Sequence, residues 1–213
     1  VTLSELRPPS LPRPSVDLLM ALPRPGTLSR IVPQIAQLGV GTLILTGASK
    51  VDPGYFKSSS LEPGSLEKLL IRGLAQAGDT ALPRVHVVQN LEALLEEGGE
   101  LDRLLPRGEG LRLVAHPGGP GAEAAEMHEL RVKPPPMPRS SSDGGGRRVL
   151  LAVGPEAGWL EPTELDLLES RGFRRVTCGE RVLRSDVAVC ALLATARELT
   201  EDWEADSAAA PRA

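Results

Sequence analysis

The chain has 213 residues and a formal net charge of −4 at pH 7. That length suits one α/β domain with appendages, and the mild negative charge argues against a strong, non-specific nucleic-acid binder, although charge can be patterned locally. No apolar run is long enough to cross a bilayer, and the two cysteines and three scattered histidines lack the spacing of a metal site.

The predicted elements alternate between strands and helices from residue 16 onward. Short apolar runs predict strands, and apolar residues at helical spacing predict helices. In chain order these are strand 16–22, helix 27–38, strand 42–46, helix 65–77, strand 84–88, helix 91–96, strand 111–115, strand 150–153, helix 162–171, strand 174–178 and a long last helix from about residue 184. This alternation is typical of an α/β fold with a mostly parallel sheet and helices on both faces.

Three segments lack the apolar pattern of strands and helices, and their composition separates them from a single domain. Residues 1–15 hold four prolines and are interpreted as a linker or ragged terminus. Residues 133–146 (KPPPMPRSSSDGGG) are low in complexity and are interpreted as an insertion inside the domain. Residues 204–213 are expected to be a disordered tail. The domain itself is therefore expected to span residues 16–203.

Two motifs follow predicted strands near the end of the chain. The first is GPEAGW at residues 154–159, and the second is CGERVLRSDVA at residues 178–188. We expect the strands before them to lie side by side. Ligands of open α/β sheets gather at the carboxyl ends of strands, so these glycine-containing loops are candidates for a binding site, although a glycine can also simply end a strand.

These motifs resemble the signature of the 16S ribosomal RNA uridine-N3 methyltransferases, in the SPOUT superfamily. That signature has a GPEGG loop followed by an aromatic residue, and then LGxxILRxETA at the start of the last helix. The chain has Ala157, Cys178, Asp186 and Val187 where the family has Gly, Leu, Glu and Thr. The resemblance extends loosely back to residue 16, without the small amino-terminal β-barrel usual in the family, which residues 1–15 cannot supply.

The resemblance implies an enzyme that uses S-adenosylmethionine to methylate N3 of a uridine in small-subunit ribosomal RNA. It also implies a carboxyl-terminal trefoil knot and a homodimer formed through the last helix, which is apolar on more than one side. Three loops would converge to bind the cofactor, and the residues assigned to it are His116, Pro117, Gly118, Gly154, Pro155, Glu156, Gly158, Cys178, Gly179, Val182, Leu183 and Ala188.

Arg184 and Glu156 are the candidate catalytic residues. Methylation of uridine N3 requires loss of its proton, and a cation such as Arg184 would stabilise the anion that develops on the base. Arg184 lies near the amino end of a helix, where the helix dipole disfavours a cation, which favours a functional role over a surface ion pair with Asp186. Glu156 is either a carboxylate at a helix start or a group that holds Arg184 or the substrate; the resemblance favours the second role.

Two aromatic residues, Tyr55 and Phe56, lie beside Lys50 and Lys57 in the loop after strand 42–46. Aromatic rings next to cations can stack on unpaired bases. A loop anchored to the hydrophobic core would use the same residues, so the sequence leaves both interpretations open.

Three functional hypotheses follow. The first is the uridine-N3 methyltransferase, the second is a SPOUT methyltransferase with another RNA target, and the third is a degenerate SPOUT domain that binds RNA or ribosomes without catalysis. Ala157, the absent barrel and the acidic charge motivate the third. The proline-rich and serine-rich segments favour a eukaryotic chain, which would place the protein in a plastid or mitochondrion; otherwise we expect a cytoplasmic protein.

Overall fold

The computed structural model describes residues 14–106, 108, 110–117, 125–126, 129–130 and 148–209, and their side chains except those of 125–126 and 201–209. The elements in chain order are β1 (Val16–Ala21), α1 (Pro25–Gln37), β2 (Val40–Thr46), η2 (Pro53–Lys57), η3 (Ser59–Leu61), α2 (Pro63–Ala77), β3 (Arg84–Val88), α3 (Leu91–Leu95), α4 (Glu100–Leu104), β4 (Gly110–Ala115), β5 (Ala125–Glu126), β6 (Arg148–Val153), α6 (Thr163–Ser170), β7 (Phe173–Thr177) and α7 (Ser185–Ala209).

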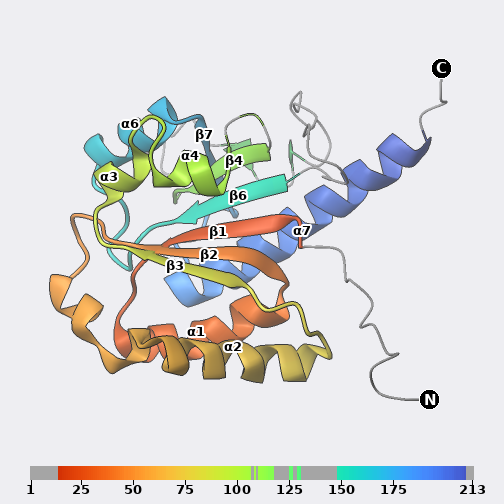
Figure 1. Ribbon diagram of the computed structural model, residues 1–213. Coiled ribbons are helices and arrows are strands. Elements are labelled where there is room, and N and C mark those ends of the chain that lie inside the picture. The colour runs from red at the N-terminus through yellow and green to blue at the C-terminus, as the bar shows by residue number, and fades with distance from the viewer. Residues whose placement is uncertain are drawn as a thin grey trace, which may run out of the picture.

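The strands form one parallel sheet in the order β3-β2-β1-β6-β4-β7-β5 (Figure 1). All residues of β1 and β2 are buried, as are five of the six residues of β6. Strands of a parallel sheet are covered on both faces and therefore read as continuous apolar runs. The predicted α/β class with a parallel sheet is confirmed, and each predicted strand occurs within two residues of its expected bounds.

Helices cover both faces of the sheet. Helix α1 packs against α2 and α7, and α7 crosses β6 and β1 on the same face. Helices α3, α4 and α6 lie on the other side, where α3 contacts both α4 and α6 (Figure 1). This arrangement leaves the carboxyl ends of β6, β4 and β7 open between the first turn of α7 and the loop before α6.

Several details differ from the sequence-based expectations. Helix α7 continues through Ala209, so it includes residues 204–209 of the segment expected to be a tail. The short α4 was missed, because it spans five residues of which only Leu101 is buried. Residues 1–13, 133–146 and 210–213 lie outside the described residues. No helix within the described ranges is both long and apolar enough to span a membrane.

Two buried charges tie elements together away from the loops at the carboxyl ends of the strands. Asp17 of β1 is 1% exposed and forms an ion pair with Arg148 of β6. Arg112 of β4 is 7% exposed and donates to Asp102 and to the carbonyls of Leu105 and Arg171, at 2.7–3.0 Å. A buried charge must be paired and hydrogen-bonded to be tolerated, so these groups fix neighbouring elements in register.

Candidate active site

Three loops meet at the carboxyl edge of the sheet. Strand β4 lies between β6 and β7 and pairs with both, so the expectation that the two motif-bearing strands are direct neighbours is wrong. The backbone amide of His116, just after β4, donates to the carbonyl of Val176 in β7 at 3.0 Å. The ends of β6, β4 and β7 therefore present their loops side by side, as the convergence of loops requires.

These loops enclose a cavity of about 990 Å³, which we call the large cavity. Ten of the residues predicted to bind the cofactor line it: His116, Pro117, Gly154, Pro155, Glu156, Gly158, Cys178, Val182, Leu183 and Ala188. Gly179 is not part of the lining; it has φ 81° in the turn after β7 and its carbonyl accepts from Thr177 Oγ1. Gly118 lies outside the described residues.

The loop 154–159 is a tight turn built around a buried indole. The amide of Gly158 donates to the carbonyl of Pro155 at 2.8 Å, and Gly158 has φ 73°, a conformation that favours glycine. Trp159 is 2% exposed and packs beside Gly154. Ala157 lines the large cavity and is itself exposed.

Two side chains that sequence reasoning did not single out as site residues hold this loop in place, and one of them, Lys50, also lines the large cavity. Lys50, in the loop after β2, donates through Nζ to the carbonyls of Ala157 and Trp159 at 3.1 Å each. Glu164, in the first turn of α6 and 6% exposed, accepts from the amides of Ser49 and Leu160 at 2.6 Å each. The loop after β2 and the loop after β6 are therefore joined on both sides of Trp159.

His116 lies at the mouth of the large cavity beside Glu161, with 2.8 Å between His116 Nε2 and Glu161 Oε1. This contact lowers the pKa of Glu161 below its ordinary value, chiefly through the hydrogen bond and then through the charge of the imidazole. The other imidazole nitrogen, His116 Nδ1, is buried without a partner among the described residues, as is Trp159 Nε1.

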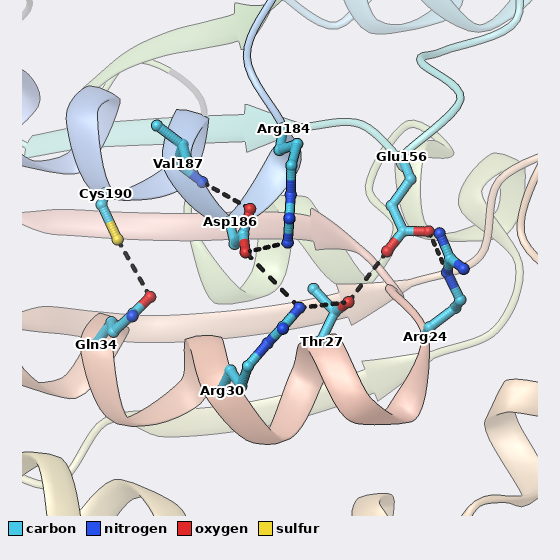
Figure 2. A network of polar contacts seen from close by, with 9 residues as sticks. All are labelled: Arg24, Thr27, Arg30, Gln34, Glu156, Arg184, Asp186, Val187 and Cys190. Atoms are coloured by element: carbon cyan, nitrogen blue, oxygen red, sulfur yellow. Dashed lines mark hydrogen bonds and ion pairs between the residues drawn. The ribbon is translucent and has the colours of Figure 1, made fainter.

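A second cavity, of about 580 Å³, adjoins the first and is called here the arginine cavity. Its lining consists of Arg24, Thr27, Arg30, Glu156, Arg184, Ser185 and Asp186. Glu156 and Ser185 line both cavities. The arginine cavity lies between the first turns of α1 and α7, as the side chains in Figure 2 show.

Glu156 does not bind Arg184, contrary to one of the roles expected for it. Glu156 accepts from Arg24 Nε at 2.5 Å and from Thr27 Oγ1 at 3.1 Å, whereas Arg184 donates to Asp186 at 2.8 Å (Figure 2). The reason is strand order: β1 pairs with β6, so the loop after β1 meets the loop after β6. The ion pair raises the pKa of Arg24, first through the hydrogen bond to Glu156.

Tyr55 and Phe56 are half-buried and pack against the hydrophobic core. This favours their role as anchors of the loop after β2 over a role in stacking on bases. Among the described residues, no group of three or more histidine, cysteine or acidic side chains is arranged to hold a metal ion.

Comparison with known proteins identifies the family. The model of the RNA methyltransferase domain matches residues 9–197, which is most of the chain. The chain belongs to the RNA methyltransferase domain family. Within the matched region lie both motifs, both cavities and every strand of the sheet.

Individual relatives of this methyltransferase domain agree with that assignment. This chain is 28% identical over 189 residues to the ribosomal RNA small subunit methyltransferase E of Treponema pallidum, and the match covers 89% of this chain and 64% of the relative. The chain thus spans slightly less than two thirds of that relative's length.

Solved structures show the same fold. The ribosomal RNA small subunit methyltransferase E of Neisseria gonorrhoeae, bound to S-adenosyl methionine, has a TM-score of 0.66 at 19% identity, over 87% of this chain and 66% of that one. The SpoU methyltransferase AviRb of Streptomyces viridochromogenes, in complex with AdoMet, has a TM-score of 0.53 at 16% identity, over 89% and 62%. At identities this low, the similarity to these structures shows a shared fold, which is of the SPOUT type.

Proposed function

We propose that this methyltransferase domain transfers a methyl group from S-adenosylmethionine to N3 of a uridine in small-subunit ribosomal RNA. The observation that carries the proposal is the pair of adjoining cavities. One is formed by the three loops assigned to the cofactor, and the other contains Arg184, the residue assigned to the base. Glu156 lines both, so a cofactor and a nucleotide would meet at this residue.

The large cavity fits the proposed cofactor in size and in chemistry. Cavities that hold ligands of this class measure roughly 300–1,000 Å³ and combine apolar walls with a few polar groups. Trp159 Nε1 and His116 Nδ1 are buried without partners among the described residues. Buried polar groups without partners are unfavourable, and a ligand rich in hydroxyl, amino and ring nitrogen atoms would supply them.

The substrate chemistry follows from Arg184. Bound S-adenosylmethionine supplies an activated methyl group, so the chain has to orient the base and stabilise the charge left when N3 loses its proton. Arg184 is 70% exposed and is held by Asp186 at 2.8 Å. Its neighbours Leu183 and Ser185 line the large cavity. A guanidinium at this boundary would stabilise the uridine anion and lower the pKa of N3.

Glu156 is the second residue we assign to the reaction. Its carboxylate is 31% exposed and already accepts from Arg24 and Thr27. From its place on both cavities, it would orient the groups that contact the nucleotide.

Calorimetric titration with S-adenosylhomocysteine tests cofactor binding. Parent protein should bind, and Ala188→Trp, which places an indole in the wall of the large cavity, should abolish binding. Ala194→Trp is the matched control, since Ala194 is an exposed residue of the same helix. Arg184→Ala should retain cofactor affinity because Arg184 does not line the large cavity.

Mass spectrometry of nucleosides from small-subunit ribosomal RNA incubated with protein and cofactor tests the reaction. A 3-methyluridine product with the parent, and its loss with Arg184→Ala, would support the proposal. Methylation of a different base would favour another RNA target. A well-folded parent that does not bind S-adenosylhomocysteine would overturn the assignment as an enzyme and favour a non-catalytic RNA-binding domain.

A further inference from the structure

The arginine cavity has more positive groups than methyl transfer to a base requires. It is lined by three guanidinium groups and two carboxylates, and Arg24 and Arg30 come from the start of α1, on the opposite side of the cavity from Arg184. Of these three arginines, the function proposed above uses only Arg184. The two arginines of α1 therefore need an explanation of their own.

The cations of this cavity face solvent and the carboxylates lie behind them. The side chains of Arg24, Arg30 and Arg184 are 66%, 60% and 70% exposed. Those of Glu156 and Asp186 are 31% and 20% exposed. An approaching anion would therefore meet guanidinium groups first.

Each guanidinium is held by its carboxylate through one nitrogen, which leaves other N–H groups available. Arg24 uses Nε, whereas Arg30 and Arg184 each use Nη2 and share the same oxygen, Asp186 Oδ2, at 3.7 and 2.8 Å (Figure 2). Arginine forms its strongest pairs when two parallel N–H groups bind one carboxylate or phosphate. None of the ion pairs described here uses this bidentate geometry.

The positions of Arg24 and Arg184 are unfavourable for the helices that follow them. Arg24 immediately precedes α1 and Arg184 immediately precedes α7, whereas Arg30 is the sixth residue of α1 and lies beyond its first turn. Cations are disfavoured at such helix ends, where anions are favoured. Exposed ion pairs also contribute little to stability. Helix stability therefore does not account for Arg24 and Arg184, and weak exposed ion pairing does not account for Arg30, whereas a bound anion would account for all three.

We propose that the arginine cavity binds a phosphodiester group of the RNA strand, held by Arg30 and Arg24, next to the nucleotide that is methylated. This inference rests on the proposed function, because that function makes RNA the anion that reaches the site. The shared lining residues Glu156 and Ser185 place the phosphate next to the cofactor cavity, where the methylated base has to meet the methyl group. The phosphate oxygens would accept from other N–H groups of Arg30 and Arg24, while the carboxylates keep the two guanidinium groups in place.

The experiment measures binding of fluorescently labelled small-subunit ribosomal RNA as a function of salt concentration, with S-adenosylhomocysteine present. Each phosphate contact contributes about 0.7 to the slope of log affinity against log salt for single-stranded RNA. Arg30→Gln should therefore reduce the slope by about 0.7 and weaken binding by about tenfold at low salt. Arg30→Lys, which retains the charge, should keep most of the slope.

Arg72→Gln is the matched control, because Arg72 is an exposed arginine of the neighbouring helix α2 and its loss changes the net charge equally. It should leave the slope unchanged. An equal reduction in Arg30→Gln and Arg72→Gln would overturn the proposal, since it would reveal a general charge effect. Unchanged cofactor affinity in Arg30→Gln would confirm that this variant folds.

The outcomes separate this inference from the function on which it rests. Cofactor binding and 3-methyluridine formation with an unaltered salt slope in Arg30→Gln would leave the function intact and refute the phosphate site. A parent that binds no RNA would refute both. Saturable binding of inorganic phosphate by the parent, lost in Arg30→Gln but without any effect of that variant on RNA, would overturn the assignment to the RNA strand.

Discussion

Gly154 lies directly against the indole ring of Trp159. A Cβ built on Gly154 would fall 3.0 Å from Trp159 Nε1 and 3.1 Å from its Cδ1 and Cε2 atoms. The glycine that follows β6 is therefore favoured by close packing against a buried side chain, and the indole it accommodates also lines the large cavity. The first residue of the motif thus shapes the cavity indirectly, through the position of Trp159.

Gly154→Ala should destabilise the protein and weaken cofactor binding. The added methyl group has to displace an indole that is 2% exposed, and overpacking of this kind costs about 1–3 kcal/mol. Chemical denaturation and calorimetry with S-adenosylhomocysteine measure the two effects. Gly64→Ala is the control, because a Cβ on Gly64 meets nothing within 4 Å. Equal stability of both variants would contradict the packing role of Gly154.

Lys50→Met should weaken cofactor binding more than it weakens the fold. It removes two hydrogen bonds to the loop 154–159 but leaves the core intact. We expect a loss of about 1 kcal/mol in unfolding free energy or less, with affinity for S-adenosylhomocysteine reduced about three- to tenfold as the loop loosens. Lys57→Met, an exposed lysine of η2, should change neither. If both lysine variants bound the cofactor as the parent does, Lys50 would have no positioning role.

Cofactor should protect Cys178 from alkylation and leave Cys190 unaffected. Cys178 lines the large cavity, whereas Cys190 does not line it and donates to Gln34 Oε1 at 3.3 Å. Burial raises the pKa of Cys190, so its reaction with iodoacetamide should be slow near neutral pH and accelerate as pH rises and the thiolate forms. Peptide mass spectrometry with and without S-adenosylhomocysteine follows both residues in one sample. Protection of both cysteines, or of neither, would argue against the assigned cofactor site.

The pKa of Glu161 should lie below its ordinary value of 4.5, and His116→Asn should raise it towards that value. A carboxyl group whose pKa is depressed on folding stabilises the protein above its unfolded-state pKa, and loses that contribution as pH falls through the folded-state pKa. The stabilising effect of His116 through Glu161 should therefore be lost as pH falls from 4.5 through the folded-state pKa of Glu161. Carbon-13 NMR titration of the Glu161 carboxyl group in both proteins checks the shift directly; identical titration curves would show that His116 does not cause it.

The homodimer expected through the last helix is also testable. Val182 and Val187 are 79% and 52% exposed, next to or within the first turn of α7, and a dimer formed through this helix would cover apolar surface of this kind. Val187→Glu should shift the protein towards monomer in sedimentation velocity. Ile71→Glu, at an exposed apolar position on α2, should not change the oligomeric state. A monomeric parent would contradict the expected dimer.

The order of strands and helices and the two motifs could be read from the sequence because they depend on neighbouring residues. Continuous apolar runs such as residues 150–153 have to be buried on both faces, and residues such as Asn90 cap a helix through a local contact, here with the amide of Ala93. Ten of the twelve predicted cofactor residues line one cavity. Loops that follow parallel strands necessarily emerge at one edge of the sheet.

Only the tertiary structure decided which distant residues meet. The sequence does not state that β4 separates β6 from β7, or that β1 pairs with β6. That pairing brings Arg24 to Glu156 across 132 positions and leaves Arg184 with Asp186. Lys50 and Glu164 were likewise missed as site residues, because their partners are mainly backbone groups of other loops. Local patterns determine the elements, whereas the order of strands determines which side chains share a site.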